Sequence, residues 1–389
     1  MNENKQPIRN LIYLADRGGT GWWRHIQAVD VFNSIQRQTG ILNTYTEQII
    51  ADPNYYAGMN SVTVQRWTAP GYKQVFEKLL MPIAKQTGMK LIYAIDDAMA
   101  YEDIPPYNSG RDAFKSAEVQ DAIKFMLENS DYLVTTTEHI KDYYERVYGI
   151  DKEKIIAVPN MLPYFWFGDR YDARKKEEQF KQYRAKPRIG VIGSLSHYNY
   201  KQLKDENGNI YKDDFDQIAD VIRETVDDYQ WVIFGLVPRQ IADLVEQKKV
   251  ECHGCIPIMG YPTIVNNLQL QAVVVPLQDN EFNRCKSPIK YLECCALGIP
   301  ILAQRMLPYV GLVPDNQMFS TQEELKERLN KLKFMSIGAY NKIIDAQWKW
   351  LNSPHKDGDF NLVSYWMEQN LGVWNRIFRI GQKDNAKEV

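Results

Sequence analysis

The 389 residues of this chain are 44% hydrophobic and 25% charged, and their formal net charge is −2. At about 100–200 residues per domain this length predicts two domains, and the composition is that of a globular protein. The near-neutral charge gives no general attraction to nucleic acid or to an anionic membrane. The polar start lacks a signal-peptide core and no apolar run reaches the about 18 residues of a membrane span, so we expect a cytoplasmic protein.

Short apolar runs alternate with amphipathic stretches through the first part of the chain. The runs predict strands at Leu11–Ala15, Ser61–Gln65, Lys90–Ile95, Tyr132–Thr135 and Ile155–Val158. The stretches predict a helix containing Trp22 and Phe32, and further helices at Tyr72–Lys85, Asp112–Leu127 and Glu138–Val147. Short strands that alternate with helices predict a parallel sheet covered on both faces.

The stretch from Met161 to Lys186 interrupts this alternation. An aromatic cluster at Tyr164–Phe167 is followed by a charged run at Arg174–Glu178. The rings are expected either to pack in a core or to stack on sugars or bases. We interpret residues 166–186 as an interdomain connection.

A second series of strands and helices follows. Strands are predicted at Arg188–Ser194, Trp231–Gly235, Val250–His253, Ala272–Pro276 and Ile299–Ala303. Helices are predicted at Phe215–Val226, Arg239–Lys248, Thr263–Leu268, Pro288–Leu297, Gln322–Lys333, Ile337–Leu351 and Asn361–Phe378. The predicted fold class is therefore α/β, with two doubly wound Rossmann-like domains facing a cleft and with C-terminal helices.

A glycine-rich loop, Asp16-Arg17-Gly18-Gly19-Thr20-Gly21, follows the first predicted strand. Glycines let backbone N–H groups approach an anion, and a helix N-terminus adds positive potential. The loop is therefore either a tight turn or a phosphate or sugar contact made by Gly18, Gly19, Thr20 and Arg24. As a dinucleotide fingerprint it is poor, because the third glycine of that motif is absent.

A basic helix start is the second candidate. Ser287 is a natural N-cap and Pro288 a natural first residue for the helix predicted there. Lys286 and Lys290 crowd the positive end of the helix dipole, which is unfavourable unless an anion binds. The alternative is a solvated basic helix start. Glu293 lies one turn into the same helix.

The segment from Pro276-Leu277 to Ile299-Pro300 resembles the donor-binding segment of the retaining GT-B glycosyltransferases, especially their family 4 group. In that group an acid one turn into this helix binds the nucleotide ribose, so the resemblance implies this role for Glu293. Cys285 stands where the family often has another acid. A branch of the family carries Lys-Ser-Pro-x-Lys, as residues 286–290 do here.

Weaker matches extend the resemblance over roughly residues 11–303. The sequence Val158-Pro159-Asn160 is similar to the family's end of the acceptor domain. Gly193-Ser194 resembles the loop that opens the donor domain, where His197 and Lys201 are candidates for the family's usual basic residues. The strand that usually ends in His-Asp ends here in Asp96-Asp97.

Asp96 and Asp97 also have a meaning of their own. Carboxylates at the carboxyl end of a strand in an α/β sheet often face a ligand. The two side chains would bind sugar hydroxyls or orient an acceptor hydroxyl. The alternative is that they cap the loop that follows.

The resemblance implies retaining transfer of a hexose or pentose from a nucleotide diphosphate sugar, expected to be a UDP-sugar, to a hydroxyl acceptor. Lys286 would neutralise the leaving diphosphate, assisted by Ser287 and Lys290. The expected parts are an acceptor-binding domain at 1–165, a donor-binding domain at 187–352 and a helix at 353–380 packing back on the first domain. No cofactor or metal is expected, because the family generally works without one and Asp96-Asp97 is not an Asp-x-Asp metal motif.

The acceptor is less well defined by the sequence. The pattern from Ile95-Asp96-Asp97 to Lys286-Ser287 is similar to glycosyltransferases encoded by large tailed phages, some of which modify hydroxymethylated bases in DNA. A modified DNA base is one candidate acceptor, in which case the protein would work in the host cytoplasm. A cell-surface or lipid-linked glycan is the other.

Other classes remain open at this level. Two Rossmann-like halves also serve nicotinamide-dependent oxidoreductases and non-catalytic sugar-binding proteins. The poor fingerprint near Gly19 argues against the first, and the lack of a signal peptide against a secreted form of the second. The pair Cys252-x-x-Cys255 is interpreted as ordinary thiols rather than zinc ligands, because no second ligand pair follows.

Overall fold

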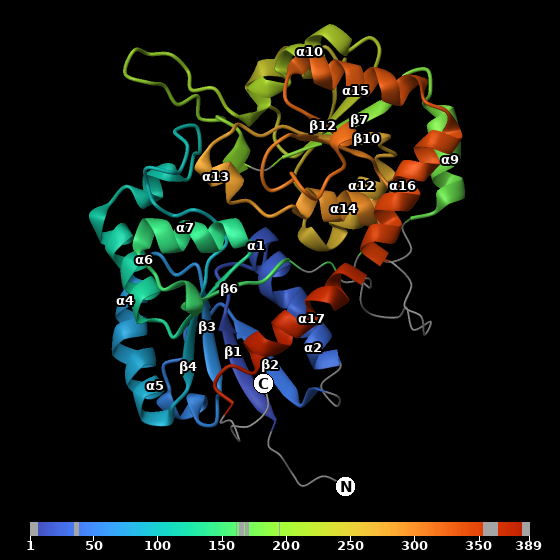
Figure 1. Cartoon of the computed structure of the whole chain (residues 1–389). Coiled ribbons are helices and arrows are strands. Elements are labelled where there is room, and N and C mark those ends of the chain that lie inside the picture. Colours follow the sequence, from blue (N-terminus) through green and yellow to red (C-terminus); the bar gives the residue numbers. More distant parts are fainter. Residues whose placement is uncertain are drawn as a thin grey trace, which may run out of the picture. The chain divides into compact units, whose positions relative to one another are not determined.

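The structure, a computed structural model, describes residues 7–34, 39–160, 162, 167, 171–193, 195–352 and 365–382. The chain divides into two compact units (Figure 1). Unit 1 comprises Met1–Tyr101, Ala113–Pro163 and Met367–Val389, and unit 2 comprises Glu102–Asp112 and Tyr164–Trp366. Among the described helices, none has the length and apolar character needed to cross a membrane.

Unit 1 is built on a parallel sheet of six strands in the order β2-β1-β3-β4-β5-β6. The strands are β1 (Ile8–Tyr13), β2 (Ile41–Thr46), β3 (Ser61–Gln65), β4 (Lys90–Ala94), β5 (Tyr132–Thr135) and β6 (Ile155–Ala157). Every side chain of the inner strand β3 is buried, as expected for a parallel strand that is covered on both faces.

Helices cover both faces of this sheet. Since β1 leads to β2 in one direction and β3 leads to β4 in the other, right-handed crossovers place the connecting helices on opposite faces. Figure 1 shows α2 and α17 on one side and α4, α5 and α6 on the other. The helices are α1 (Gly19–Gly21), a π-helical turn (Trp22–Ile26), α2 (Gln27–Ser34), α4 (Pro70–Val75), a second π-helical turn (Phe76–Leu80), α5 (Met81–Thr87), α6 (Ala117–Asn129), α7 (Glu138–Tyr148) and α17 (Tyr365–Phe378).

The last helix, α17, is held in unit 1 by its C-terminal end. The buried Asn10 side chain donates a hydrogen bond to the Phe378 carbonyl oxygen at 2.8 Å. The Phe378 ring meets the ring of Phe32 edge to face, with centroids 4.9 Å apart. These contacts tie the end of the described chain to β1 and α2.

Unit 2 contains a second parallel sheet of six strands, in the order β12-β11-β10-β7-β8-β9. The strands are β7 (Arg188–Ile192), β8 (Gln230–Phe234), β9 (Glu251–His253), β10 (Ala272–Val275), β11 (Ile301–Gln304) and β12 (Met318–Phe319). The helices are α9 (Ala173–Gln182), α10 (Ala219–Thr225), α11 (Ala242–Glu246), α12 (Tyr261–Asn267), α13 (Glu281–Arg284), α14 (Ile289–Leu297), α15 (Gln322–Phe334) and α16 (Ile337–Asn352).

Helix α9 lies inside the stretch that the sequence analysis interpreted as a connection. Its residue Phe180 is buried in the core of unit 2 and stacks on Tyr340 of α16, with ring centroids 4.4 Å apart. Residues 173–182 are therefore an integral helix of unit 2. Tyr164, Phe165 and Trp166 of the predicted aromatic cluster lie outside the described residues.

Two further local features differ from the sequence prediction. The edge strands β2 and β12 were not predicted. The N-cap of α14 is Pro288 rather than Ser287, and the helix begins at Ile289. Its predicted terminator is confirmed, because Gly298 adopts the left-handed conformation at the C-cap. The fold class is confirmed as well: both halves of the chain are doubly wound α/β units.

Candidate functional site

Each sheet has one topological switch point, where consecutive crossovers leave in opposite directions. In unit 1 it lies between β1 and β3, and in unit 2 between β7 and β10. Ligands of open α/β sheets bind beyond the carboxyl ends of the strands at such points. Ligand contacts are therefore expected in the segments that follow these four strands.

The glycine loop after β1 has the geometry of a tight turn. The Gly18 carbonyl oxygen accepts a hydrogen bond from Trp22 N at 2.9 Å. A side chain at Gly21 would place its Cβ 1.7 Å from the Asp16 carbonyl oxygen, so this glycine is required by the fold. Gly18 and Gly19 are exposed, and a Cβ at Gly19 would meet nothing within 4 Å. The fold therefore accounts for Gly21, while Gly19 remains a predicted ligand contact.

An arginine that the sequence analysis did not single out organises the switch point of unit 1. Arg66 directly follows β3 and donates a hydrogen bond to Thr20 Oγ1 at 3.1 Å. Its guanidinium lies 3.6 Å from Asp96 Oδ1 and 3.5 Å from Asp97 Oδ2. The structure thus brings together three predicted residues, Thr20, Asp96 and Asp97, around one unpredicted cation.

The electrostatics of this cluster follow from its burial. Burial alone would lower the pKa of Arg66, but the carboxylates of Asp96, Asp97 and Asp16 raise it above its ordinary value. Arg66 also has a φ of 50°, a left-handed conformation that costs a residue other than glycine about 1–3 kcal/mol. A charged side chain held by a strained backbone at a switch point is the kind of placement that marks ligand sites.

Arg24, predicted to contact the substrate, serves the framework of unit 1 instead. It is 2% exposed and donates to the carbonyl oxygens of Val158 and Thr135 and to Asn160 Oδ1, at 2.7–3.0 Å. Burial lowers its pKa to about 10. Its partners Val158 and Asn160 belong to the sequence that resembled the end of the family's acceptor domain. Arg24 thus holds the ends of β5 and β6 together.

The start of α14 carries the predicted donor-site residues. Lys290 Nζ lies 2.9 Å from Glu293 Oε2 and donates to the Tyr261 hydroxyl at 3.0 Å. The Tyr261 hydroxyl in turn donates to Glu293 Oε2, and burial beside that carboxylate raises the pKa of Tyr261 well above its ordinary value. Lys286 lies over the Phe282 ring, 3.8 Å from its centroid. Ser287 stands between the two lysines in sequence, one residue before the cap.

These contacts change the argument for a bound anion. The Lys290 charge at the positive helix end is compensated within the protein by Glu293, one turn away on the same face. The Lys286 cation is stabilised by an aromatic ring, which carries no net charge. The helix dipole therefore gives no reason of its own to expect an anion at Lys290. Glu293 is 4% exposed, and a carboxylate offers about four acceptor sites, so two bonds to one oxygen leave capacity for ribose hydroxyls.

The loop after β7 contains the remaining candidates. Gly193 N donates to the Phe234 carbonyl oxygen of β8, and Ser194 lies outside the described residues. Lys201 is turned to the Ser109 carbonyl oxygen, at 3.3 Å. His197 Nδ1 lies 2.7 Å from Oδ2 of Asp214, a fully buried carboxylate that the sequence analysis did not identify.

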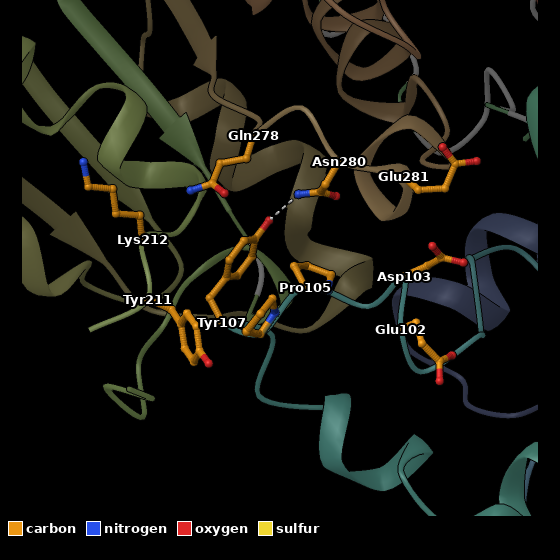
Figure 2. Close-up of a pocket in the computed structure, with 10 residues that line it drawn as sticks. Glu102, Asp103, Pro105, Tyr107, Tyr211, Lys212, Gln278, Asn280 and Glu281 are labelled. Carbon is orange, nitrogen blue, oxygen red and sulfur yellow. Dashed lines mark hydrogen bonds between the residues drawn. The ribbon is translucent and has the colours of Figure 1, made fainter. Parts of the chain in front are cut away.

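A cavity of about 330 Å³ lies in unit 2 beside this loop. Figure 2 shows Tyr107 at its centre, with its hydroxyl bonded to Asn280. The lining residues are Glu102, Asp103, Pro105, Pro106, Tyr107, Tyr211, Lys212, Gln278, Asn280 and Glu281. None of the predicted site residues lines it, but its wall is continuous with the Asp214 network, since the Tyr107 hydroxyl and Gln278 N both donate to Asp214.

Comparisons with known proteins find solved structures with a similar fold but no matching sequence family. No family model matches the chain, and no curated protein matches it in sequence. A glycosyltransferase from Rickettsia africae ESF-5 is 13% identical with a TM-score of 0.56, over 98% of this chain and 100% of that one. HepE from Anabaena, solved with UDP and glucose, is 12% identical with a TM-score of 0.57, over 89% of this chain and 95% of that one.

WaaG, a glycosyltransferase involved in lipopolysaccharide biosynthesis, is 12% identical with a TM-score of 0.55, over 97% of this chain and 100% of that one. At these identities the likeness shows a shared two-domain Rossmann-like fold. It extends over nearly the whole chain, so the two units and their order along the sequence are those of these glycosyltransferase structures.

Proposed function

We propose that this protein is a glycosyltransferase that moves a sugar from a nucleotide diphosphate sugar to a hydroxyl group. The observation that carries the proposal is the likeness in fold over the whole chain to glycosyltransferases, one of which holds UDP and glucose. The predicted donor-binding residues then lie where such a fold binds ligands, beyond the strand ends of unit 2.

The proposed donor is a UDP-sugar, with its ribose bound by Glu293 and its diphosphate by Lys286. Charge develops on the diphosphate as the glycosidic bond breaks, so a fixed cation there stabilises the transition state more than the ground state. Lys286 fits this role because it lies two residues before the N-cap of α14, in the segment that follows β10, with its cationic head over the Phe282 ring. No metal is assigned to the reaction.

Retaining transfer is part of the proposal and comes from the sequence resemblance. It is tested separately from transfer itself, by following the anomeric proton of the first product by NMR. A product whose anomeric configuration matches that of the donor supports retention, and the opposite configuration rejects it.

The acceptor proposed for unit 1 is a hydroxyl-rich glycan. Asp96, Asp97 and Asp16 surround Arg66 at the strand ends, so the cluster carries more negative than positive charge. Carboxylates accept hydrogen bonds from sugar hydroxyls, whereas they repel the phosphate backbone of DNA. The cation Arg66 beside both acids also disfavours a divalent metal there. A hydroxymethylated DNA base remains an outcome of the acceptor test.

The first experiment is a thermal-shift panel with UDP, GDP and NAD. A ligand at 100 times its Kd stabilises the folded protein by about 2.7 kcal/mol, which is easily resolved. Stabilisation by a nucleoside diphosphate and not by NAD is expected. The second step incubates the protein with nucleotide sugars and with either glycans or hydroxymethylated DNA, and detects the added sugar by mass spectrometry. Stabilisation by NAD alone, or no transfer to any acceptor, would reject the proposed function.

A further inference from the structure

Asp214 is a buried carboxylate on which four hydrogen bonds converge. It is fully buried, at the first residue of the 3-10 turn Asp214–Gln217. Its Oδ1 accepts from the Tyr107 hydroxyl, from Gln278 N and from Asn283 Nδ2, each at 2.8 Å. Its Oδ2 lies 2.7 Å from His197 Nδ1. Three of these bonds end on Oδ1 and one on Oδ2, so Oδ1 is saturated as an acceptor.

The donors come from segments far apart in the sequence. His197 belongs to the loop after β7, and Gln278 to the segment after β10, so Asp214 spans the switch point of unit 2. Asn283 comes from α13, and Tyr107 from the segment Glu102–Asp112. One buried charge therefore fixes the segments that line the expected ligand position.

The bond to His197 also fixes the chemistry of the imidazole. A buried carboxylate without a proton only accepts hydrogen bonds, so Nδ1 of His197 must carry a proton. The other nitrogen, Nε2, is then an acceptor in the neutral ring and a donor in the charged ring. The side chain of His197 is 22% exposed, in contrast to that of Asp214.

We propose that Asp214 is a positioning residue that holds a proton on His197 Nδ1, so that Nε2 donates to the donor diphosphate. The inference rests on the proposed function. When the anionic diphosphate arrives, the imidazole takes one proton from solvent at Nε2, and that N–H donates to a phosphate oxygen. The Asp214 carboxylate compensates the new positive charge, which makes proton uptake part of donor binding.

Tyr107 and Asp213 are titratable groups that lie next to this pair. Burial, then the Asp214 charge, raise the pKa of Tyr107, so its hydroxyl stays protonated and keeps donating. Asp213 precedes Asp214 and accepts from Asn199 N, Phe215 N and Gln240 Nε2. Its pKa is raised by burial, and it lies among its own donors.

The test is calorimetry of nucleotide-sugar binding in buffers of different ionisation enthalpy, which counts the protons taken up. A nucleotide sugar is used because its diphosphate diester does not titrate near neutral pH, whereas a terminal phosphate does, with a pKa of about 6. UDP-glucose and GDP-mannose are the probes. Wild type is expected to take up protons on binding, up to about one per donor bound.

Three variants separate positioning from simple support of the fold. His197→Gln and Asp214→Asn should both abolish the uptake and weaken binding about 10–100-fold, the loss of one charge-assisted hydrogen bond. Tyr107→Phe is the matched control, since it removes another bond to the same carboxylate and should leave the proton count unchanged. If Asp214 only supports the fold, Asp214→Asn and Tyr107→Phe will behave alike.

A second readout does not depend on binding or on the Asp214→Asn variant being folded. Nitrogen-15 NMR of wild type, with the His197 signals assigned by their loss in His197→Gln, should show the proton on Nδ1 in the free protein. A neutral ring protonated on Nε2 overturns the inference. Donor binding without proton uptake overturns it too, while the proposed function stands. If neither probe binds, the donor site and this inference fail together.

Discussion

Replacing Glu293 by alanine tests the centre of the proposed donor site and produces two separable effects. The carboxylate accepts from the Tyr261 hydroxyl and lies 2.9 Å from Lys290 Nζ. Without it, the Tyr261 hydroxyl, in a side chain that is 9% exposed, loses its acceptor, and stability should fall by about 1–3 kcal/mol. The free energy of nucleotide binding changes separately. Loss of a hydrogen bond from the ribose to a charged group costs about 1.5–3 kcal/mol of binding, which weakens nucleotide affinity about 10–100-fold.

The two effects are measured on the same sample, stability by urea unfolding and affinity by calorimetry with UDP. Tyr261→Phe is the matched control, because it removes one bond to Glu293 while the carboxylate remains for the ribose. We expect it to change UDP affinity by less than tenfold. A folded Glu293→Ala protein that binds UDP as tightly as wild type would refute the ribose assignment and leave Glu293 as the partner of Lys290.

Three further predictions address the other residues. Lys286→Ala should lower turnover by about 10²–10³ and change the Michaelis constant for the donor by a smaller factor. Lys290→Ala should lower turnover less than Lys286→Ala does. Wild-type turnover in Lys286→Ala would exclude a role of this lysine at the diphosphate. Transfer should continue in excess EDTA, and complete loss restored by Mg²⁺ or Mn²⁺ would contradict a metal-free reaction. Burial, with a smaller effect of the Arg24 charge, holds the pKa of His25 well below 6.5, so the unfolded chain binds a proton that the folded one does not. The free energy of unfolding should therefore fall by up to about 1.4 kcal/mol per pH unit as the pH drops below about 6.5. His25→Gln should flatten this pH dependence in urea unfolding. An unchanged pH dependence in the variant would show that His25 is not its cause.

All the inner strands of both sheets were predicted from the sequence, together with the edge strands β6 and β9. Strand β10, Ala272–Val275, is a continuous apolar run with all four side chains buried, and such a run identifies a central parallel strand. Strand β2 reads Ile-Leu-Asn-Thr-Tyr-Thr and lies at the sheet edge with its last three side chains half-buried. Its polar composition gives no such run. Strand β12 has two residues, too few for any periodicity.

The interpretation of residues 166–186 as a connection failed over α9 for a similar reason. Helix α9 is mostly charged, yet it buries Phe180 and the stem of Lys176, and its apolar stripe is one residue wide per turn. A long lysine stem covers apolar surface while its head finds a polar partner, here Asn266 Oδ1 at 3.3 Å. A high density of charged residues therefore does not distinguish a linker from a helix that buries one residue per turn.

The site residues divide according to whether their partners are near in sequence. Asp96 and Asp97 were identified because polar residues at the carboxyl ends of strands often face a ligand. Arg66 directly follows β3, so the same reasoning would have identified it from the sequence. Asp214 and Tyr261 could not be identified by their position relative to a strand end. The partners of Asp214 are 17, 64, 69 and 107 residues away, and the fold alone brings them together.

The two lysines at the start of α14 show what a local electrostatic argument can decide. Two cations at a positive helix end require compensation, but the requirement does not say whether a ligand or the protein supplies it. For Lys290 the sequence already held the answer, because Glu293 three residues on shares its helix face, and the structure pairs them. For Lys286 the structure supplies the ring of Phe282, which attracts the cation through its quadrupole. Because Glu293 already compensates the charge of Lys290, we assign the diphosphate of the proposed donor to Lys286 rather than to Lys290.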